Sequence, residues 1–243
     1  MSFAKKIEPL LFFLCVKFSN MKNLPWYLIT GFIIITLITL FALYKATGKS
    51  KLVLLLSSGW LLLQGFISNS GFYTVTDTMP PRFLLTLLFP ILLILWLLLS
   101  KRGKKFTANH SLKDLTLLHS IRILVELGLY SLSVYKVIPE LMTFEGRNFD
   151  IMAGLTAPLV YYFGFIRQKL STIVILMWNF ICVALLANIV IHAMLAAPFP
   201  FQQLAFEQAN IALLYFPFTW LPGFIVPVVL YAHLVSIQRL TKK

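Results

Sequence analysis

The chain has 243 residues, of which 59% are hydrophobic and 12% are charged. An average soluble domain is roughly 45–50% apolar and about 25% charged. With 21 Lys and Arg and 8 Asp and Glu, the chain has too few charges to cover a soluble fold of this length. The composition excludes a soluble enzyme, a disordered chain and a coiled coil, and it predicts an all-α polytopic membrane bundle.

The formal net charge is +13. In a soluble protein such an excess suggests a nucleic-acid partner, but here the positive charges form short clusters between apolar runs, as in the cytoplasmic loops of membrane proteins. We therefore expect the lipid bilayer as a partner and no nucleic acid. Cys15 and Cys182 both lie inside apolar runs, so they indicate neither a disulfide framework nor a metal site.

Seven apolar stretches approach the roughly 20 residues that a membrane-spanning helix needs. They are residues 25–44, 52–72, 83–100, 115–135, 151–167, 171–194 and 211–236. Asp77, Pro80, Pro81 and Arg82 separate the second from the third and cannot continue a helix. The prediction is therefore a bundle of seven transmembrane helices.

The basic residues orient this bundle. If the first span starts outside, the inward segments are all basic, and no outward loop between spans carries a net positive charge. The inward segments hold Lys45, Lys49 and Lys51; Lys101, Arg102, Lys104, Lys105 and Lys113; Arg167 and Lys169; and Arg239, Lys242 and Lys243. By the positive-inside rule, we expect the N-terminus outside and the C-terminus in the cytoplasm, in a bacterial inner membrane.

Residues 1–20 fit this pattern less well, because their apolar part is too short to cross a bilayer. One interpretation is that Met21 is the biological start and that residues 1–20 are an upstream extension. The other is an interfacial anchor. Residues 21–243 are expected to form a single transmembrane domain.

His119, Arg122 and Glu126 interrupt the fourth span, where ionisable groups are costly unless they have a partner or a cavity. Spacings of three and four place them on one helical face, which must point into the bundle or at water. From the helical rise, Glu126 is expected near the bilayer midplane, with Arg122 about 6 Å nearer the cytoplasm.

Two interpretations of this stripe stay open. In the structural one, Arg122 and Glu126 form an ion pair that orders helix packing. In the functional one they form a proton or substrate site, where Glu126 titrates and Arg122 holds an anion or tunes Glu126. His119 would then suit a proton route, and Asn179 of the sixth span lies at a similar depth.

The seventh span carries Pro217, Pro222 and Pro227 at intervals of five, which remove backbone donors and kink the helix. Broken helices at midplane depth often line transporter sites, although kinked helices without transport are also common. Residues 198–210, which precede this span, predict a short interfacial helix. His233 lies near its inner end and shares a predicted layer with His119.

The outer loop between the fourth and fifth spans contains Glu145, Arg147 and Asp150. Asp150 is well placed to cap the fifth span, and Glu145 and Arg147 either pair with each other or meet a ligand from outside. With His192 near the outer end of the sixth span, these residues form a second candidate site. The alternative is a solvated turn.

Several motifs are absent. No span carries HxxxH, HExxH or CxxC, and there is no GxSxG or Gly-rich phosphate loop. The sequence therefore predicts no metal ligands, no catalytic residues and no cofactor.

From about His119 onward the chain resembles a group of uncharacterised bacterial multi-span inner-membrane proteins. The resemblance is carried by His119-x-x-Arg122-x-x-x-Glu126, by the segment from Met142 to Asp150, and by Trp178-Asn179. It covers about half of the chain and implies a shared unit of residues without an assigned activity.

The leading hypothesis is a small transporter or permease with Glu126 and Arg122 at a central polar site for an unknown small molecule or ion. One alternative is a membrane-embedded enzyme that acts on a lipid or isoprenoid at the outer face. The other is a structural or accessory subunit of a complex with a membrane-protein partner.

Overall fold

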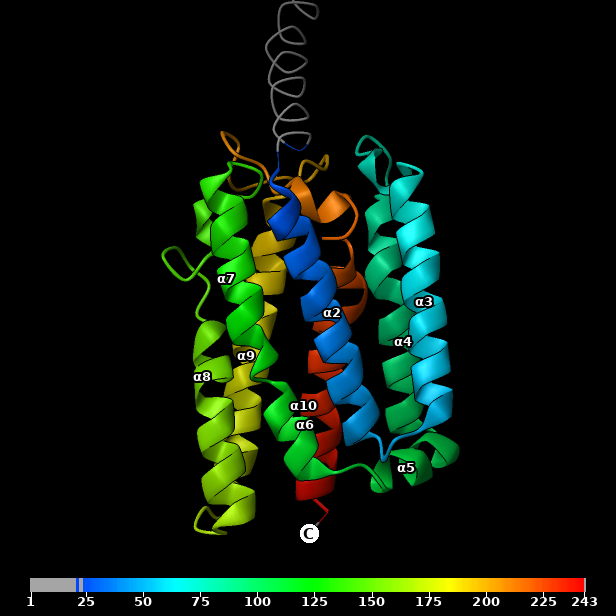
Figure 1. The fold of residues 1–243 in the computed structure, drawn as a ribbon, viewed down its shortest axis with the longest axis vertical. Helices are drawn as coiled ribbons and strands as arrows, with labels where there is room; N and C mark the ends of the chain where they lie inside the picture. The colour runs from blue at the N-terminus through cyan, green and yellow to red at the C-terminus, as the bar shows by residue number, and fades with distance from the viewer. Residues whose placement is uncertain (1–20, 22–23, 243) are drawn as a thin grey trace, which may run out of the picture.

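Apolar runs of this length satisfy their backbone hydrogen bonds by forming helices, and the computed structural model is all-helical where it describes the chain (Figure 1). It describes Met21 and residues 24–242. The expectation for residues 1–20 therefore lies outside the described residues.

Six helical segments of the described chain are long and apolar enough to cross a membrane. They are α2 (Trp26–Ala46), α3 (Lys51–Asn69), η2 with α4 (Arg82–Leu84, Leu85–Leu99), α6 with α7 (Leu112–Leu118, Ile121–Val134), α9 (Thr172–Leu195), and η6 with α10 (Leu221–Ile225, Val226–Leu240). The connections carry η1 (Phe72–Thr74), α5 (Lys101–Ala108), η3 (Glu140–Met142) and η5 (Ala212–Leu214). The predicted all-helical class is confirmed.

The prediction of seven full-length spans is wrong at residues 151–167. This segment forms α8 (Ile151–Val160), continued by the π-helical turn η4 (Tyr161–Ile166), and is shorter than a span. Figure 1 shows that α8 begins beside the lower part of α7. Pro139 and the polar residues after it do not form a long helix, and this loop runs back into the bundle, where Ile138 and Met142 are fully buried.

Two expectations near the seventh span also need correction. The interfacial helix expected at residues 198–210 is absent, because Pro198 and Pro200 interrupt the chain directly after α9. The final long helix begins at Leu221 rather than at residue 211. Residues 211–220 are irregular apart from the short turn η5.

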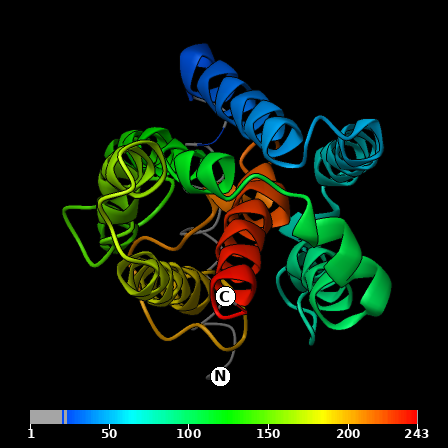
Figure 2. The same ribbon diagram turned by 90° about the horizontal axis from the view of Figure 1, so that it is seen from below.

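Helix α10 lies at the centre of the bundle and packs against α9, α6 and α4 (Figure 2). Most of this span is buried, whereas α3 is the least buried of the six. Side-chain hydrogen bonds tie α3 to η6 and to the residue directly before it. Trp60 Nε1 donates to the Gly223 carbonyl at 2.8 Å, and Trp220 Nε1 donates to the Leu61 carbonyl at 3.0 Å.

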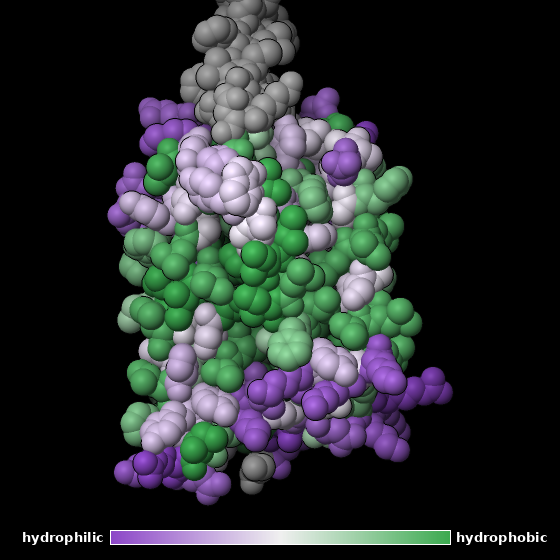
Figure 3. Space-filling model, viewed as in Figure 1, coloured by the Kyte–Doolittle hydropathy of each residue, from purple (hydrophilic) through white to green (hydrophobic). Residues whose placement is uncertain are grey.

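The face of the molecule in Figure 3 is mostly apolar over the middle of the bundle and more polar at its two ends. Exposed apolar side chains occur on several helices, among them Phe41, Leu92, Met177 and Ile181. By contrast, the charged side chains of Arg122, Glu126 and Asp150 are buried inside the bundle. This distribution is typical of a membrane protein whose helices contact a lipid bilayer.

The start of α8 approaches α7 backbone to backbone at Gly154. A Cβ atom at this position would lie 2.9 Å from the Ile123 backbone nitrogen and 3.2 Å from the Arg122 Cβ. Real Cβ atoms essentially never come so close to backbone. The absence of a side chain at Gly154 therefore allows the loop end before α8 to reach Arg122.

We predict that Gly154→Ala lowers the free energy of unfolding by about 1–3 kcal/mol, because the added methyl group forces α7 and α8 apart. The matched control is Gly59→Ala on the exposed face of α3, where a Cβ meets nothing within 4 Å. That change should be neutral or slightly stabilising, because alanine favours helix by about 1 kcal/mol. Unfolding in mixed micelles measures both, and equal effects of the two changes would contradict the close approach.

Candidate functional site

The predicted stripe lies inside the bundle. Helix α6 ends at Leu118 and α7 begins at Ile121, so a turn at residues 119–120 separates His119 from the other two. The side chains of His119, Arg122 and Glu126 are all buried, with 0%, 2% and 2% exposure. The turn directs the three side chains to two different groups of partners.

Arg122 forms its ion pair with Asp150 rather than with Glu126. Its Nε lies 3.0 Å from Asp150 Oδ2, and both side chains are nearly inaccessible. The ion pair expected between Arg122 and Glu126 is thus wrong, because the loop end carries Asp150 down beside α7. Asp150 occupies the N-cap position of α8, but its side chain makes no capping hydrogen bond.

Glu126 is held by the amide of Asn148, which is fully buried. Asn148 Nδ2 lies 2.7 Å from each carboxyl oxygen of Glu126 and 3.0 Å from the Met142 carbonyl. Its Oδ1 accepts a hydrogen bond from the Asp150 backbone N–H at 3.0 Å. One amide therefore ties the carboxyl group of α7 to the loop that supplies Asp150.

His119 belongs to a second, aromatic group. Its ring stacks on His233 of α10 with ring centroids 3.6 Å apart, and Trp178 packs edge-to-face with His119 and at a tilt against His233. Asn179 belongs to this aromatic group and makes no hydrogen bond to Arg122 among the described contacts. Its Oδ1 lies 2.8 Å from His233 Nδ1, and its amide nitrogen donates to the Ile175 carbonyl. Since Asn179 Oδ1 can only accept, His233 Nδ1 carries the proton.

The second predicted site does not come together. Glu145 and Arg147 are exposed, whereas Asp150 is buried in the ion pair. His192 is half-buried, and its Nδ1 contacts the Asn188 carbonyl within α9 at 2.8 Å. The sequence analysis placed residues 145–150 in one outer loop. The chain turns inward there, so Glu145 is exposed whereas Asp150 is buried in the bundle.

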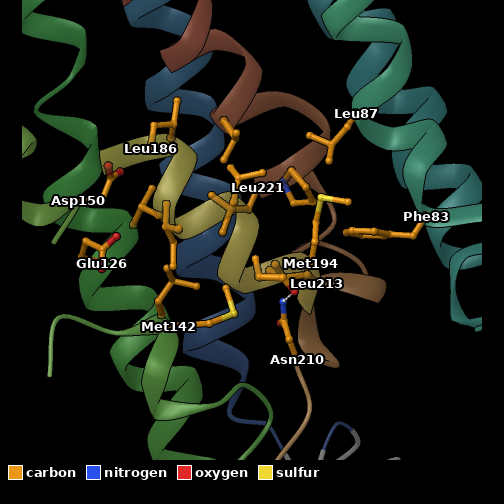
Figure 4. Close-up of a pocket in the computed structure, with 17 residues that line it drawn as sticks. Phe83, Leu87, Glu126, Met142, Asp150, Leu186, Met194, Asn210, Leu213 and Leu221 are labelled. Carbon is orange, nitrogen blue, oxygen red and sulfur yellow. Dashed lines mark hydrogen bonds between the residues drawn. The ribbon is translucent and has the colours of Figure 1, made fainter. Parts of the chain in front are cut away.

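A cavity of about 70 Å³ lies beside the charged group (Figure 4). Three polar side chains line it, Glu126, Asp150 and Asn210, and the remaining lining residues are apolar. Pro222 of the π-helical turn η6 is among them, whereas Arg122 is not. The cavity therefore faces the carboxyl groups and not the guanidinium.

Several buried polar atoms in this region have no hydrogen-bond partner among the described residues. They are Asp150 Oδ1, Asn210 Oδ1, Arg122 Nη1, His233 Nε2 and both ring nitrogens of His119. Buried polar atoms are normally paired, and exceptions need a physical reason. Two of these atoms, on Asp150 and Asn210, belong to side chains that line the cavity.

Asn148 and Asn210 are the two site residues that sequence reasoning did not single out. Both stand in polar or proline-flanked stretches, where an asparagine is typical of a turn. The signal for Asn148 is its place in the segment from Met142 to Asp150, which already carried the family resemblance. Among the described residues, no group of three or more His, Cys, Asp or Glu side chains is arranged to hold a metal ion.

Comparison with protein families finds one match. The family described as "Domain of unknown function (DUF8737)" matches residues 80–241, about two thirds of the chain, so the chain belongs to this family. The matched region contains every residue of the charged and aromatic groups above. No curated protein and no solved structure matches the chain.

The ion pair yields a stability prediction. Asp150→Asn alone should lower the free energy of unfolding by about 3–5 kcal/mol, because it leaves Arg122 buried and uncompensated. The double variant Arg122→Gln with Asp150→Asn should recover more than half of that loss.

The control is the peripheral pair Lys45–Asp114, whose atoms are 3.4 Å apart and in which Lys45 is exposed and Asp114 is partly buried. Its coupling energy should not exceed about 1 kcal/mol. Double-mutant cycles in mixed micelles measure both couplings. A central coupling no larger than that of the surface pair would contradict the assignment.

Proposed function

We propose that this member of the family is a small proton-coupled permease in which Glu126 carries the proton. The observation that carries the proposal is the cavity itself, which is lined by Glu126 and by two side chains, Asp150 and Asn210, that each have an unpartnered oxygen. A polar group retained only for helix packing is expected to satisfy its own atoms. Unpartnered acceptors on a cavity wall favour a site that is filled during function.

Charge balance supports Glu126 as the proton carrier. Arg122 and Asp150 neutralise each other at 3.0 Å, so Glu126 decides the net charge of the group. An ionised Glu126 leaves one uncompensated negative charge inside the bundle, which is costly in a medium of low dielectric constant. Binding a proton removes that charge, and releasing it requires something to replace it.

Irregular backbone around the cavity favours a role in transport over a role in helix packing alone. The loop from Lys136 to Asp150 and the π-helical turn η6 both lie beside it. Non-helical backbone at membrane depth is tolerated where protein or a cavity surrounds it. Discontinuous helices and π-bulges are frequent at functional sites of membrane proteins.

The membrane and its orientation are part of the proposal. The exposed residues Lys101, Arg102, Lys104 and Lys105 of α5 lie at the same end of the bundle as the C-terminus (Figure 1). By the positive-inside rule, we assign this end to the cytoplasm of a bacterial inner membrane. The proton then reaches Glu126 past the aromatic pair His119 and His233, which lies on the α5 side of Glu126.

The two alternative functions have less support. An outer-face enzyme would bring Glu145, Asp150 and His192 together, but Glu145 is exposed and Asp150 is committed to Arg122. An accessory subunit would use the exposed apolar face of α3, which lipid covers equally well. Neither alternative accounts for the unpartnered oxygens at the cavity.

The proposal predicts that Glu126→Gln reduces proton flux through reconstituted vesicles to the level of protein-free vesicles, because an amide cannot exchange the proton. An entrapped pH-sensitive dye measures the flux under an imposed pH gradient. Glu145→Gln is the matched control and should leave the flux close to wild type. If folded Glu126→Gln protein carries protons as fast as wild type, the proposed role of Glu126 fails.

A further inference from the structure

The lining of the central cavity indicates which solutes fit it. Asp150 and Asn210 are 5% and 2% exposed, and each has one side-chain oxygen without a partner. In Figure 4, Glu126 and Asp150 approach the cavity from one side and Asn210 approaches from below. The polar groups of the wall therefore stand apart, with apolar residues between them.

The side-chain amides of Asn210 and Asn148 already have acceptors. Asn210 Nδ2 donates to the Ala193 carbonyl at 3.2 Å, which leaves its Oδ1 as a pure acceptor. Asn148 Nδ2 donates to Glu126 and to Met142. Because Arg122 does not line the cavity, the wall offers acceptors and negative charge but no free side-chain donor. Such a wall disfavours anions. The cavity therefore does not support the sequence-based expectation that Arg122 holds an anion.

The apolar part of the wall limits the body of the solute. Leu129, Leu186, Leu213 and Met194 are among the apolar residues that line the cavity. By the same measure one water needs about 10–15 Å³, so the cavity of about 70 Å³ accommodates several waters or a body of a few carbon atoms. A short alkyl chain with a donor group matches both properties.

We propose that this cavity binds a small protonated amine with a short apolar body, in exchange for the proton of Glu126. The inference rests on the proposed function and names its substrate class. With the amine absent, Glu126 holds a proton and the group of Arg122, Asp150 and Glu126 is neutral. When the proton leaves Glu126, the ammonium group of the amine supplies the positive charge in its place. The group of Arg122, Asp150 and Glu126, together with its bound proton or amine, is therefore neutral in both states.

The charges around Glu126 agree with this exchange. On its own helix Arg122 faces Asp150, which comes from the loop before α8. Helix α9 contributes the Cys182 carbonyl, 3.5 Å from Arg122 Nη2. Helix α10 contributes His233, stacked on His119. None of these groups occupies the cavity, so an ammonium group is free to meet Glu126 and Asp150.

Ligand-dependent thermal unfolding of the purified chain in detergent tests the site without relying on transport. The probes are n-butylammonium, butyrate and butan-1-ol, which share one apolar body and differ in the head group. We expect saturable stabilisation by n-butylammonium alone, stronger at alkaline than at acidic pH because the proton of Glu126 competes with the amine.

Two cavity variants sharpen the test. Val190→Phe should weaken n-butylammonium binding about tenfold or more, because the larger side chain takes up volume in the cavity that Val190 lines. Ala193→Leu should weaken it by filling the cavity while keeping every polar group, so one variant stays informative if the other fails to fold. Asn188→Leu, on α9 outside the lining, is the matched control and should bind like wild type.

The outcomes separate the inference from the proposed function. Amine binding that Val190→Phe and Ala193→Leu weaken, in protein that shows no Glu126-dependent proton flux even with n-butylammonium present, supports the cation site and contradicts the permease. Glu126-dependent flux without saturable stabilisation by n-butylammonium contradicts the cation site and leaves the permease standing. Equal stabilisation by butan-1-ol or butyrate also overturns the assignment of a cation.

Discussion

The ion pair between Arg122 and Asp150 determines how the middle of the bundle is built. Its two charges come from α7 and from the loop before α8, and they lie 3.0 Å apart where both are buried. For Asp150 to reach Arg122, the chain must descend into the bundle before α8 begins. The short α8, the buried loop and the close approach at Gly154 all follow from that requirement.

The same pair gives Glu126 its special position. Because Arg122 is neutralised by Asp150, Glu126 depends on the Asn148 amide and on whatever occupies the cavity. Proton exchange and ammonium binding are two ways to balance one negative charge. The permease and the cation site therefore rest on one physical constraint, which is the cost of an uncompensated carboxylate in a medium of low dielectric constant.

The sequence predicted the long helices well, because an apolar run must form a helix in lipid. Residues 25–44 and 171–194 correspond closely to α2 and α9. The prediction of a fifth full-length span was wrong, because apolar content does not reveal that the polar loop before α8 is buried in protein. Asp150 and Asn148 were missed as central residues for the same reason, since their neighbours are typical of an exposed turn and their partners lie on α7.

The most direct test is a pH-difference infrared spectrum of the reconstituted chain, which detects the carbonyl stretch of a protonated carboxyl group. If the ion pair holds Asp150 ionised and leaves Glu126 to exchange the proton, the band disappears in Glu126→Gln and persists in Asp150→Asn. A band that persists in Glu126→Gln and disappears in Asp150→Asn would assign the proton to Asp150 and contradict the account.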